Sequence, residues 1–331
     1  MSDAVRIAGT GRWLPPRVLA NPQAAALAGV DEEWIVRRTG IRERRVADDG
    51  VGTAAMAMAA ARQALDSGSL SAGDIGLIVV ATSSPDHLTP PTACEVQAAI
   101  GAHAAAAFDV EAGFAGWIYA LIIAESLLRT DAARAALVVG VEKLSTVTDR
   151  SDPQTGPLFG DGAGAAVLVR GEGPLAVRAR SWWADGRLAD ALKRPSGGSA
   201  RPFDRTVLEE RSHLLRMEGT KLFRAAVRTM ASQARAALEH AGLSAGDVGL
   251  VVPHQANLRI IEAAARELGV PMERVYVNVD RYGNTGAATI PIALDEAVRS
   301  GAVDATRPTL LMSFGAGATA GAVVLGVTRA G

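Results

Sequence analysis

The chain is poor in cysteine and aromatic residues, and it has no excess of either charge. Its single cysteine, Cys94, excludes a disulfide within the chain and favours a reducing, cytoplasmic setting. A net charge of −1, from 34 basic and 35 acidic residues, gives no reason to expect a nucleic-acid partner. The N-terminus lacks the basic-then-apolar order of a signal peptide. We therefore expect a cytoplasmic protein that does not bind nucleic acid.

One stretch, 309–328, runs for twenty residues without a charge, which is long enough to span a bilayer. It contains four glycines, three of them clustered just after Phe314. Glycine at this density favours two short apolar strands around a turn over a membrane helix. The sequence therefore predicts no membrane association.

Two kinds of segment occur twice along the chain. ARQALDSGSLSAGDIGLIVV begins at Ala61, and ARAALEHAGLSAGDVGLVVP begins at Ala234. FGDGAGAAVLV begins at Phe159, and FGAGATAGAVVLG begins at Phe314. Because helix, strand and glycine turn follow in the same order each time, the pattern indicates an internal duplication.

Continuous apolar runs predict buried strands, and amphipathic periods between them predict helices. The fold class expected is therefore α/β, with two duplicated halves at 1–172 and 173–331. The stretch 184–215, rich in Arg, Gly, Ser and Pro, is typical of an irregular insertion near a binding site. Strands are predicted at 77–81, 136–141, 250–252 and 309–312, and helices at 52–67, 91–100, 115–129, 220–241, 257–268 and 288–299.

Three stretches of the second half carry side chains suited to chemistry. VVPHQANLRI places His254 at the end of a buried strand, and RYGNTGAATIPIAL places Asn284 in a glycine turn. SFGAGATAG offers backbone N–H groups from a glycine-rich turn. An imidazole, an amide and backbone donors can all hydrogen-bond the oxyanion or enolate of a thioester. We predict a thioester site of this kind, with no metal and no tightly bound cofactor.

These stretches, in order with WIVRRTGIRERR, FDVEAGFAGWIYAL, LFGDGAGAAVL and LLRMEG, resemble the β-ketoacyl-acyl-carrier-protein synthase III family over essentially the whole chain. The resemblance implies a thiolase-like fold, in which each half is a five-stranded mixed sheet and the layers run α-β-α-β-α. It also implies a homodimer that acts on thioesters of coenzyme A or of the phosphopantetheine of an acyl carrier protein.

In the family, the stretch FDVEAGFAGWIYAL carries the catalytic cysteine, and here its position is taken by Phe114. A thiol at a helix N-terminus has a lowered pKa and accepts the acyl group. The family's histidine and asparagine then hold a malonyl thioester while it loses CO2. The resemblance carries these roles to His254 and Asn284, and it makes the backbone of Phe114 and Ala316 the oxyanion donors.

Further roles are implied by position. Trp34 and Arg38 match family residues that contact coenzyme A, and Asn257 matches one that hydrogen-bonds the pantetheine arm. Arg224 and Arg259 match basic residues that face the carrier protein. Pro153 stands where the family often has an arginine against the adenine. This departure weakens the expectation for coenzyme A as donor and leaves carrier-bound acyl groups open.

Other residues near these motifs have simpler interpretations. Cys94 lies on the apolar face of a helix, which favours a buried, inert thiol over a substitute nucleophile. We expect Glu111, three residues before Phe114, to be a salt-bridged support, although a catalytic base is the alternative. Trp117, together with the pair 182–183, is a candidate to line or cap the pocket.

Three interpretations of Phe114 stay open. The first is an enzyme of polyketide or other specialised acyl biosynthesis that works without covalent acylation. It would either decarboxylate a malonyl thioester or use His254 as a base for direct acyl transfer. The second is a non-catalytic partner subunit of an active ketosynthase. The third is an ordinary condensing enzyme in which the cysteine was replaced by engineering.

Overall fold

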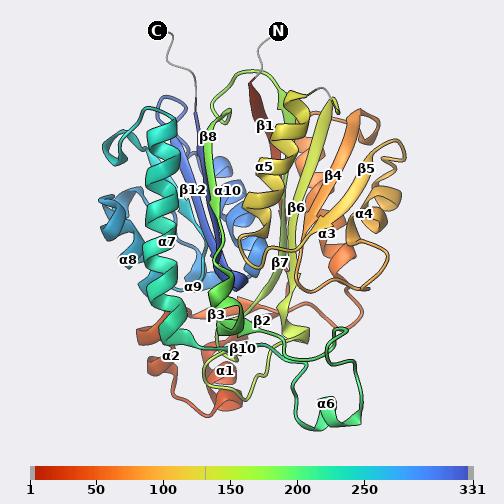
Figure 1. The fold of residues 1–331 in the computed structure, drawn as a ribbon, viewed down its shortest axis with the longest axis vertical. Helices are drawn as coiled ribbons and strands as arrows, with labels where there is room; N and C mark the ends of the chain where they lie inside the picture. Colours follow the sequence, from red (N-terminus) through yellow and green to blue (C-terminus); the bar gives the residue numbers. More distant parts are fainter. Residues whose placement is uncertain (1–3, 131, 327–331) are drawn as a thin grey trace.

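The structure, a computed structural model, describes residues 4–130 and 132–326. Two mixed sheets are packed with helices between them and on their outer faces (Figure 1). The strands are β1 Val5–Trp13, β2 Val18–Ala20, β3 Glu43–Arg45, β4 Ile75–Ala81, β5 Ala106–Val110, β6 Ala135–Lys143, β7 Asp161–Arg170, β8 Val177–Trp183, β9 Leu192–Lys193, β10 Arg216–Met217, β11 Leu250–Pro253, β12 Thr309–Gly315 and β13 Thr319–Leu325. The α-helices are α1 Asn21–Ala28, α2 Glu32–Thr39, α3 Thr53–Gly68, α4 Thr92–Ile100, α5 Gly116–Arg129, α6 Arg205–Glu209, α7 Gly219–His240, α8 Leu258–Leu268, α9 Val279–Tyr282 and α10 Thr289–Arg299.

The two sheets repeat the same strand order, which confirms the predicted duplication. The first sheet runs β1-β7-β6-β4-β5, and the second runs β8-β13-β12-β11 in the corresponding order. In both, two antiparallel pairings are followed by a parallel one. The repeated SAGD segments form matching capping boxes, Ser71 with Asp74 and Ser244 with Asp247. Each capping box closes the turn that leads into a parallel strand.

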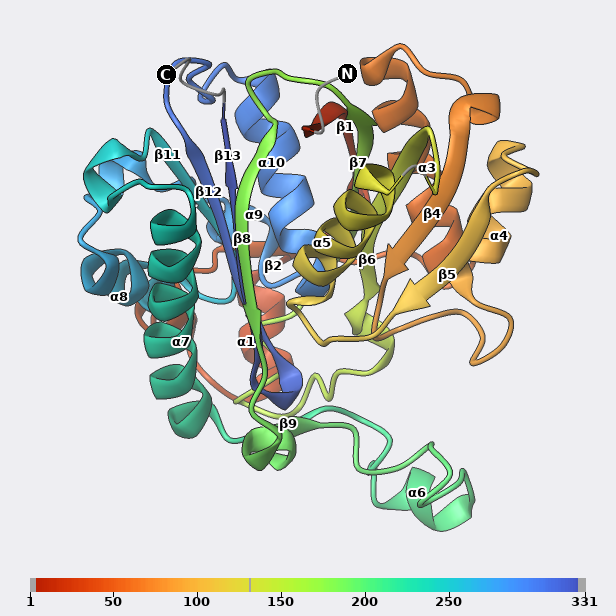
Figure 2. The ribbon, with the colours of Figure 1, turned by 45° about the horizontal axis from the view of Figure 1, so that its top comes forward.

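The layers follow the predicted α-β-α-β-α order. Helices α5 and α10 lie between the sheets, α3 and α4 cover the outer face of the first, and α7 and α8 cover that of the second (Figures 1 and 2). Because α5 and α10 are enclosed on both sides, most of their residues are buried. The helix starts that face the site therefore lie deep in the molecule.

The second sheet has four strands, and the prediction of five in each half is wrong there. A single parallel bridge, Val251 with Val275, stands where the first sheet has β5. Beyond this bridge, the side-chain amide of Gln255 forms hydrogen bonds with the backbone groups that a fifth strand would otherwise contact. Its nitrogen donates to Tyr276 O at 3.0 Å, and its oxygen accepts from Asn278 N at 2.9 Å.

The uncharged run after Thr309 forms the antiparallel pair β12 and β13, as predicted. Over residues 4–130 and 132–326, no helix combines the length and the hydrophobicity needed to cross a bilayer. The insertion 184–215 holds only short elements, and α6 projects away from the two sheets (Figure 2). The first sheet ends at Arg170 and the second begins at Val177.

Candidate active site

Phe114 occupies the turn between β5 and α5, immediately before the helix start. Its side chain is 7% exposed and packs on two rings, Phe159 at 5.8 Å and His254 at 5.7 Å between centroids. Its backbone carbonyl accepts a hydrogen bond from Ser313 Oγ at 3.0 Å. A Cβ at Gly315 would lie 2.4 Å from Phe114 N, so only glycine permits this approach of the two loops.

His254 follows the end of β11 and is almost fully buried. Its backbone N–H donates to Met312 O at 2.8 Å, which extends the pairing of β11 with β12 by one residue. Its Nδ1 lies 2.6 Å from Thr289 Oγ1. Burial lowers the pKa of His254 to about 3, so the ring is neutral at physiological pH.

Asn284 lies in the glycine turn between α9 and α10. Its backbone N–H donates to Leu158 O at 2.9 Å, and its carbonyl accepts from Gly160 N at 3.0 Å. The side-chain Oδ1 accepts from Gly286 N at 2.9 Å. Because the oxygen of the amide is engaged in the turn, the Nδ2 group is the end available to a ligand.

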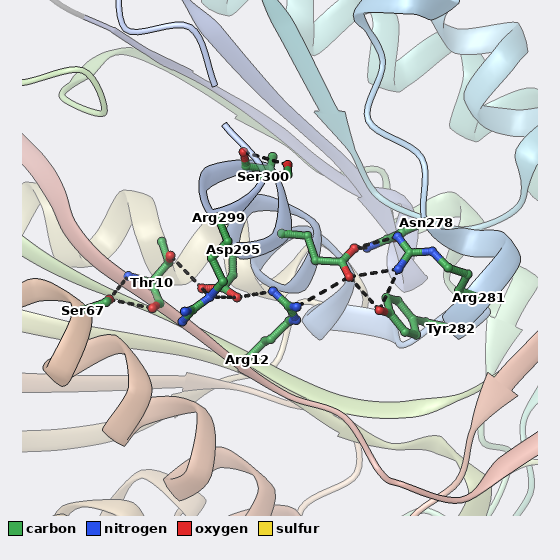
Figure 3. A network of polar contacts seen from close by, with 11 residues as sticks. Thr10, Arg12, Ser67, Asn278, Arg281, Tyr282, Asp295, Arg299 and Ser300 are labelled. Carbon is green, nitrogen blue, oxygen red and sulfur yellow. Dashed lines mark hydrogen bonds and ion pairs between the residues drawn. The ribbon is translucent and has the colours of Figure 1, made fainter. Parts of the chain in front are cut away.

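A buried polar network holds the segment that leads into Asn284 (Figure 3). Glu296 on α10 accepts hydrogen bonds from Asn278 at 2.9 Å, Tyr282 at 2.6 Å and Arg281 at 3.0 Å. Burial by itself raises the pKa of Glu296, but these hydrogen bonds outweigh burial and leave that pKa lowered. The network therefore ties α9 to α10, the two helices that flank Asn284.

A second buried carboxyl group, Glu142 at the end of β6, lies behind the Asn284 turn. It accepts hydrogen bonds from Ser84 Oγ at 2.5 Å, from Ser83 and from the backbone of Ala287. Burial raises its pKa to about 7 despite these bonds. A Cβ at Gly286 would lie 2.8 Å from Glu142 Cγ and 3.0 Å from Phe114 Cδ1, so the three groups are in close contact.

His254, Asn284 and Phe114 line one cavity of about 120 Å³. The rest of its wall is mainly apolar and comes from β9, α7, α8 and the loops beside them. These wall residues include Phe159, Leu192, Met217, Leu222, Phe223, Ala226, Met230, Asn257, Ile260 and Phe314. Two hydrogen-bonding side chains in a small, mainly apolar cavity can bind a carbonyl oxygen with little competing water.

The other residues predicted for the site lie at various distances from this cavity. Asn257 lines it and also caps α8, accepting from Ile260 N at 3.1 Å. Arg259 is exposed and lies 5.9 Å from the ring of Phe223, a wall residue. Arg224 lines a groove of about 1020 Å³ that adjoins the cavity, since Met217 and Gly219 line both. The backbone of Ala316 lies against Gly113, beside Phe114.

Trp34 and Arg38 contact each other on α2, with the guanidinium 5.2 Å from the indole centroid. Neither is among the residues that line the cavity. Within the two described ranges, no group of three or more His, Cys, Asp or Glu side chains is arranged to hold a metal ion.

The prediction that Trp117 lines or caps the pocket is wrong. Its side chain is 1% exposed and its indole N–H donates to Val138 O at 3.3 Å, so it belongs to the core between the sheets. Trp182 is 51% exposed on the surface, and Trp183 lines the groove that adjoins the cavity.

Glu111 accepts a hydrogen bond from Gly113 N at 3.0 Å, so it supports the turn through the backbone, whereas a salt bridge was expected. Cys94 is half-buried beside Ala107, whereas full burial was expected, and it does not line the cavity. Its packing between α4 and the edge strand β5 leaves one side of the thiol uncovered.

Comparison with known proteins gives a consistent result. Family models described as 3-oxoacyl-[acyl-carrier-protein (ACP)] synthase III, and as its C-terminal part, match residues 108–186 and 238–327. The β-ketoacyl-[acyl-carrier-protein] synthase III of Roseiflexus castenholzii is 45% identical over 98% of both chains.

Two solved structures extend the likeness to the fold. The 3-oxoacyl-[acyl-carrier-protein] synthase III of Aquifex aeolicus superposes with a TM-score of 0.89 at 43% identity, covering 97% of this chain and 99% of that one. The priming β-ketosynthase of the R1128 polyketide pathway gives 0.89 at 37% identity, covering 97% and 95%.

Proposed function

Because this chain belongs to the 3-oxoacyl-[acyl-carrier-protein] synthase III family, we propose that it decarboxylates a malonyl thioester without forming an acyl-enzyme. The observation that carries the proposal is the shared cavity, where His254 and Asn284 are present but residue 114 offers only a phenyl ring. A phenylalanine side chain has no nucleophilic atom. The retained pair nevertheless keeps the donors that decarboxylation requires.

The reaction needs charge stabilisation and one proton. The bond between the carboxylate carbon and the α-carbon breaks, and its electron pair forms the enolate while CO2 leaves. The negative charge collects on the thioester oxygen, where N–H donors of His254 and Asn284 stabilise it. A proton from water then reaches the α-carbon and yields an acetyl thioester. The hydroxide left behind combines with CO2 as bicarbonate.

The assay that tests this function uses malonyl-coenzyme A and a malonyl-loaded acyl carrier protein. We expect CO2, counted together with the bicarbonate that it forms, and acetyl thioester in equal amounts, with no added mass on the intact protein. If no CO2 is released, and simple acyl thioesters are neither transferred nor hydrolysed, the proposal of an enzymatic function is contradicted.

In that case the chain would be a partner subunit that shapes a neighbouring active ketosynthase. The Phe114 ring favours this second candidate, since it fills space between Phe159 and His254. Co-purification with a cysteine-bearing homologue would support it. A catalytically active homodimer would contradict it.

We propose an acyl carrier protein as the main donor and the basic face of α7 and α8 as its docking surface. Arg224 and Arg259 are exposed on this face, and Arg259 stacks on a ring of the cavity wall. Trp34 and Arg38 would contact the coenzyme A form of the substrate. The likeness to a priming β-ketosynthase supports a place in polyketide biosynthesis.

Charge reversal of the docking surface provides the test. Arg224→Glu with Arg259→Glu is expected to raise KM for the carrier-bound thioester by about tenfold, because charge pairs steer the encounter. The same variant should leave KM for a pantetheine thioester unchanged. Arg62→Glu, an exposed arginine on α3, serves as the matched control. An equal loss with both substrates would argue against a docking role.

A homodimer is proposed from the edge of the first sheet. β5 is the outermost strand, and it is partly exposed although it lies beside the site. Leu88, in the loop before α4, is 87% exposed. An uncovered strand edge beside an exposed leucine is typical of a surface that pairs with a second copy. Sedimentation equilibrium would test it, and a monomer at micromolar concentration would contradict it.

A further inference from the structure

A furrow runs along β1, the edge strand of the first sheet opposite β5, between helices α3 and α10. Gln63 and Ser67 on α3 line one side of it, and Val298 and Arg299 at the end of α10 line the other. The furrow consists of two hollows of about 350 and 130 Å³, and Arg299 lines both. Neither hollow shares a lining residue with the cavity of the candidate active site, so the furrow is a separate feature.

The larger hollow contains two arginine side chains that share one buried carboxylate (Figure 3). Arg12 Nη1 donates to Asp295 Oδ2 at 2.5 Å, and Arg299 Nε donates to the same oxygen at 2.8 Å. The two guanidinium groups therefore lie side by side. The Asp295 side chain is fully buried, whereas those of Arg12 and Arg299 are 28% and 47% exposed. The carboxylate thus holds the two cations from inside the protein and leaves part of each open to solvent.

This cluster carries more positive than negative charge. The network of Figure 3 joins three basic side chains to two acidic ones, namely Arg12, Arg281, Arg299, Asp295 and Glu296. Among the described residues, Arg299 has no partner other than Asp295, which it contacts through Nε alone. Its two terminal nitrogens are therefore available, and a planar guanidinium suits a carboxylate. No acidic side chain of the described residues lines either hollow, so nothing there repels an anion.

The smaller hollow is mainly apolar and begins where the polar one ends. The polar groups in its wall already have partners. Ser67 Oγ donates to Thr10 O at 2.7 Å, and the Thr10 hydroxyl donates to Asp295 at 2.9 Å. This hollow can therefore accept a hydrocarbon chain but offers little to a polar group. Its apolar wall comes from the start of β1, the loop before β8 and the end of α10, namely Ile7, Ala8, Gly9, Leu175 and Val298.

We propose that the furrow is a binding site for a short aliphatic carboxylate. The carboxylate group contacts Arg12 and Arg299, and the chain packs against Leu175 and Val298. Because Arg299 lies where the two hollows meet, one small ligand reaches both of them. An inorganic anion would leave the apolar hollow unfilled, and an uncharged chain would leave the excess positive charge without a partner. The inference does not rest on the proposed function, because the furrow and the cavity have no residue in common.

The experiment uses hexanoate as the probe and the indole N–H of Trp13, which lines the larger hollow, as the reporter. Nitrogen-15 labelling of the five tryptophans gives one indole signal each, and Trp13 is identified by the loss of its signal in Trp13→Phe. Hexanoate should shift this signal saturably. Affinity should rise about fourfold for each methylene from propanoate to hexanoate, the usual gain for a buried methylene. Hexanamide, which has the same chain without the charge, should bind about tenfold more weakly.

Two variants test the two halves of the site separately. Arg299→Gln removes a cation, and Val298→Asp places a negative charge at the apolar hollow, where Val298 is 36% exposed. Each is expected to weaken hexanoate binding by about tenfold. Val18→Asp, at a 38% exposed valine on β2, and Arg205→Gln, at an exposed arginine that also pairs with an acid one helical turn away, are the matched controls. Both controls should bind hexanoate as the unaltered protein does.

The proposal is overturned if hexanoate does not shift the Trp13 signal saturably. Equal affinity for hexanamide and hexanoate would also overturn it, as would unchanged affinity in Val298→Asp. Thermal unfolding shows whether Arg299→Gln is folded. Should that variant be unstable, a loss of binding in Val298→Asp with normal binding in Val18→Asp still supports the site, because both of these changes are made at exposed positions.

Discussion

Phe114→Cys is expected to convert the protein into one that is covalently acylated by acyl-coenzyme A, seen as an added acyl mass on the intact chain. The new thiol would stand immediately before α5 and beside His254. A helix N-terminus lowers a thiol pKa, and the thiolate is the attacking form. Removing the ring also opens space beside Phe159 for an acyl group. The unaltered protein should show no adduct.

Phe114→Ala is the matched control, because it opens the same space without a thiol. Removal of a buried phenylalanine costs about 3–5 kcal/mol, so thermal unfolding should be measured for both variants. With malonyl-carrier protein present, the cysteine variant should also release a 3-ketoacyl product. A folded cysteine variant that acquires no acyl group would mean that the pocket has diverged from condensation.

His254→Ala and Asn284→Ala are each expected to reduce malonyl decarboxylation by about 10²- to 10³-fold, the usual effect of removing one oxyanion donor. Since both donors serve one oxygen, the double variant should lose less than the product of the two single losses. Release of CO2 at saturating substrate is the measurement. Cys94→Ser should behave as the unaltered protein, because that thiol lies outside the cavity.

The pH profile gives a further check on the same pair. Burial lowers the pKa of His254 to about 3, so the imidazole stays neutral from pH 5 to pH 8. His254 should therefore cause no inflection of the rate near pH 6.5, the ordinary pKa of histidine. Burial raises the pKa of Glu142 to about 7, so Glu142→Gln is the control. An activity that falls as a group with pKa near 6.5 becomes protonated, and still does so in Glu142→Gln, would contradict a buried neutral donor.

Much of the fold follows from local patterns. The apolar period at 220–241 predicts α7 to within a residue at each end, and the glycines after Phe314 predict the β12–β13 turn. The N-terminal strand β1 is not predicted, because Gly9 and Gly11 interrupt its apolar alternation. Glycine is required at these positions because α3 packs closely against β1. A Cβ at Gly9 would lie 2.3 Å from Ala64 O.

The candidate site also contains residues that the sequence predicts and residues that it does not. His254 and Asn284 are predictable from their motifs, and the structure brings both to the cavity beside Phe114. The contact of Thr289 with His254 is not predictable, because a threonine at a helix start is common and gives no sign of a distant partner. The misplaced Trp117 shows the same limit, because a helix in the middle layer buries side chains on all faces.

The sequence by itself determined the duplicated α/β organisation, the family resemblance and the absence of a thiol at residue 114. These features depend on residue identity and on short-range periodicity, which a single chain displays directly. Only the tertiary structure decided how Phe114 packs on His254, which atom of Asn284 is engaged in its turn and that the Thr289 hydroxyl lies against His254. Those properties arise from contacts between segments far apart in the chain, such as Ser313 with Phe114, 199 residues away, and no local pattern specifies such contacts.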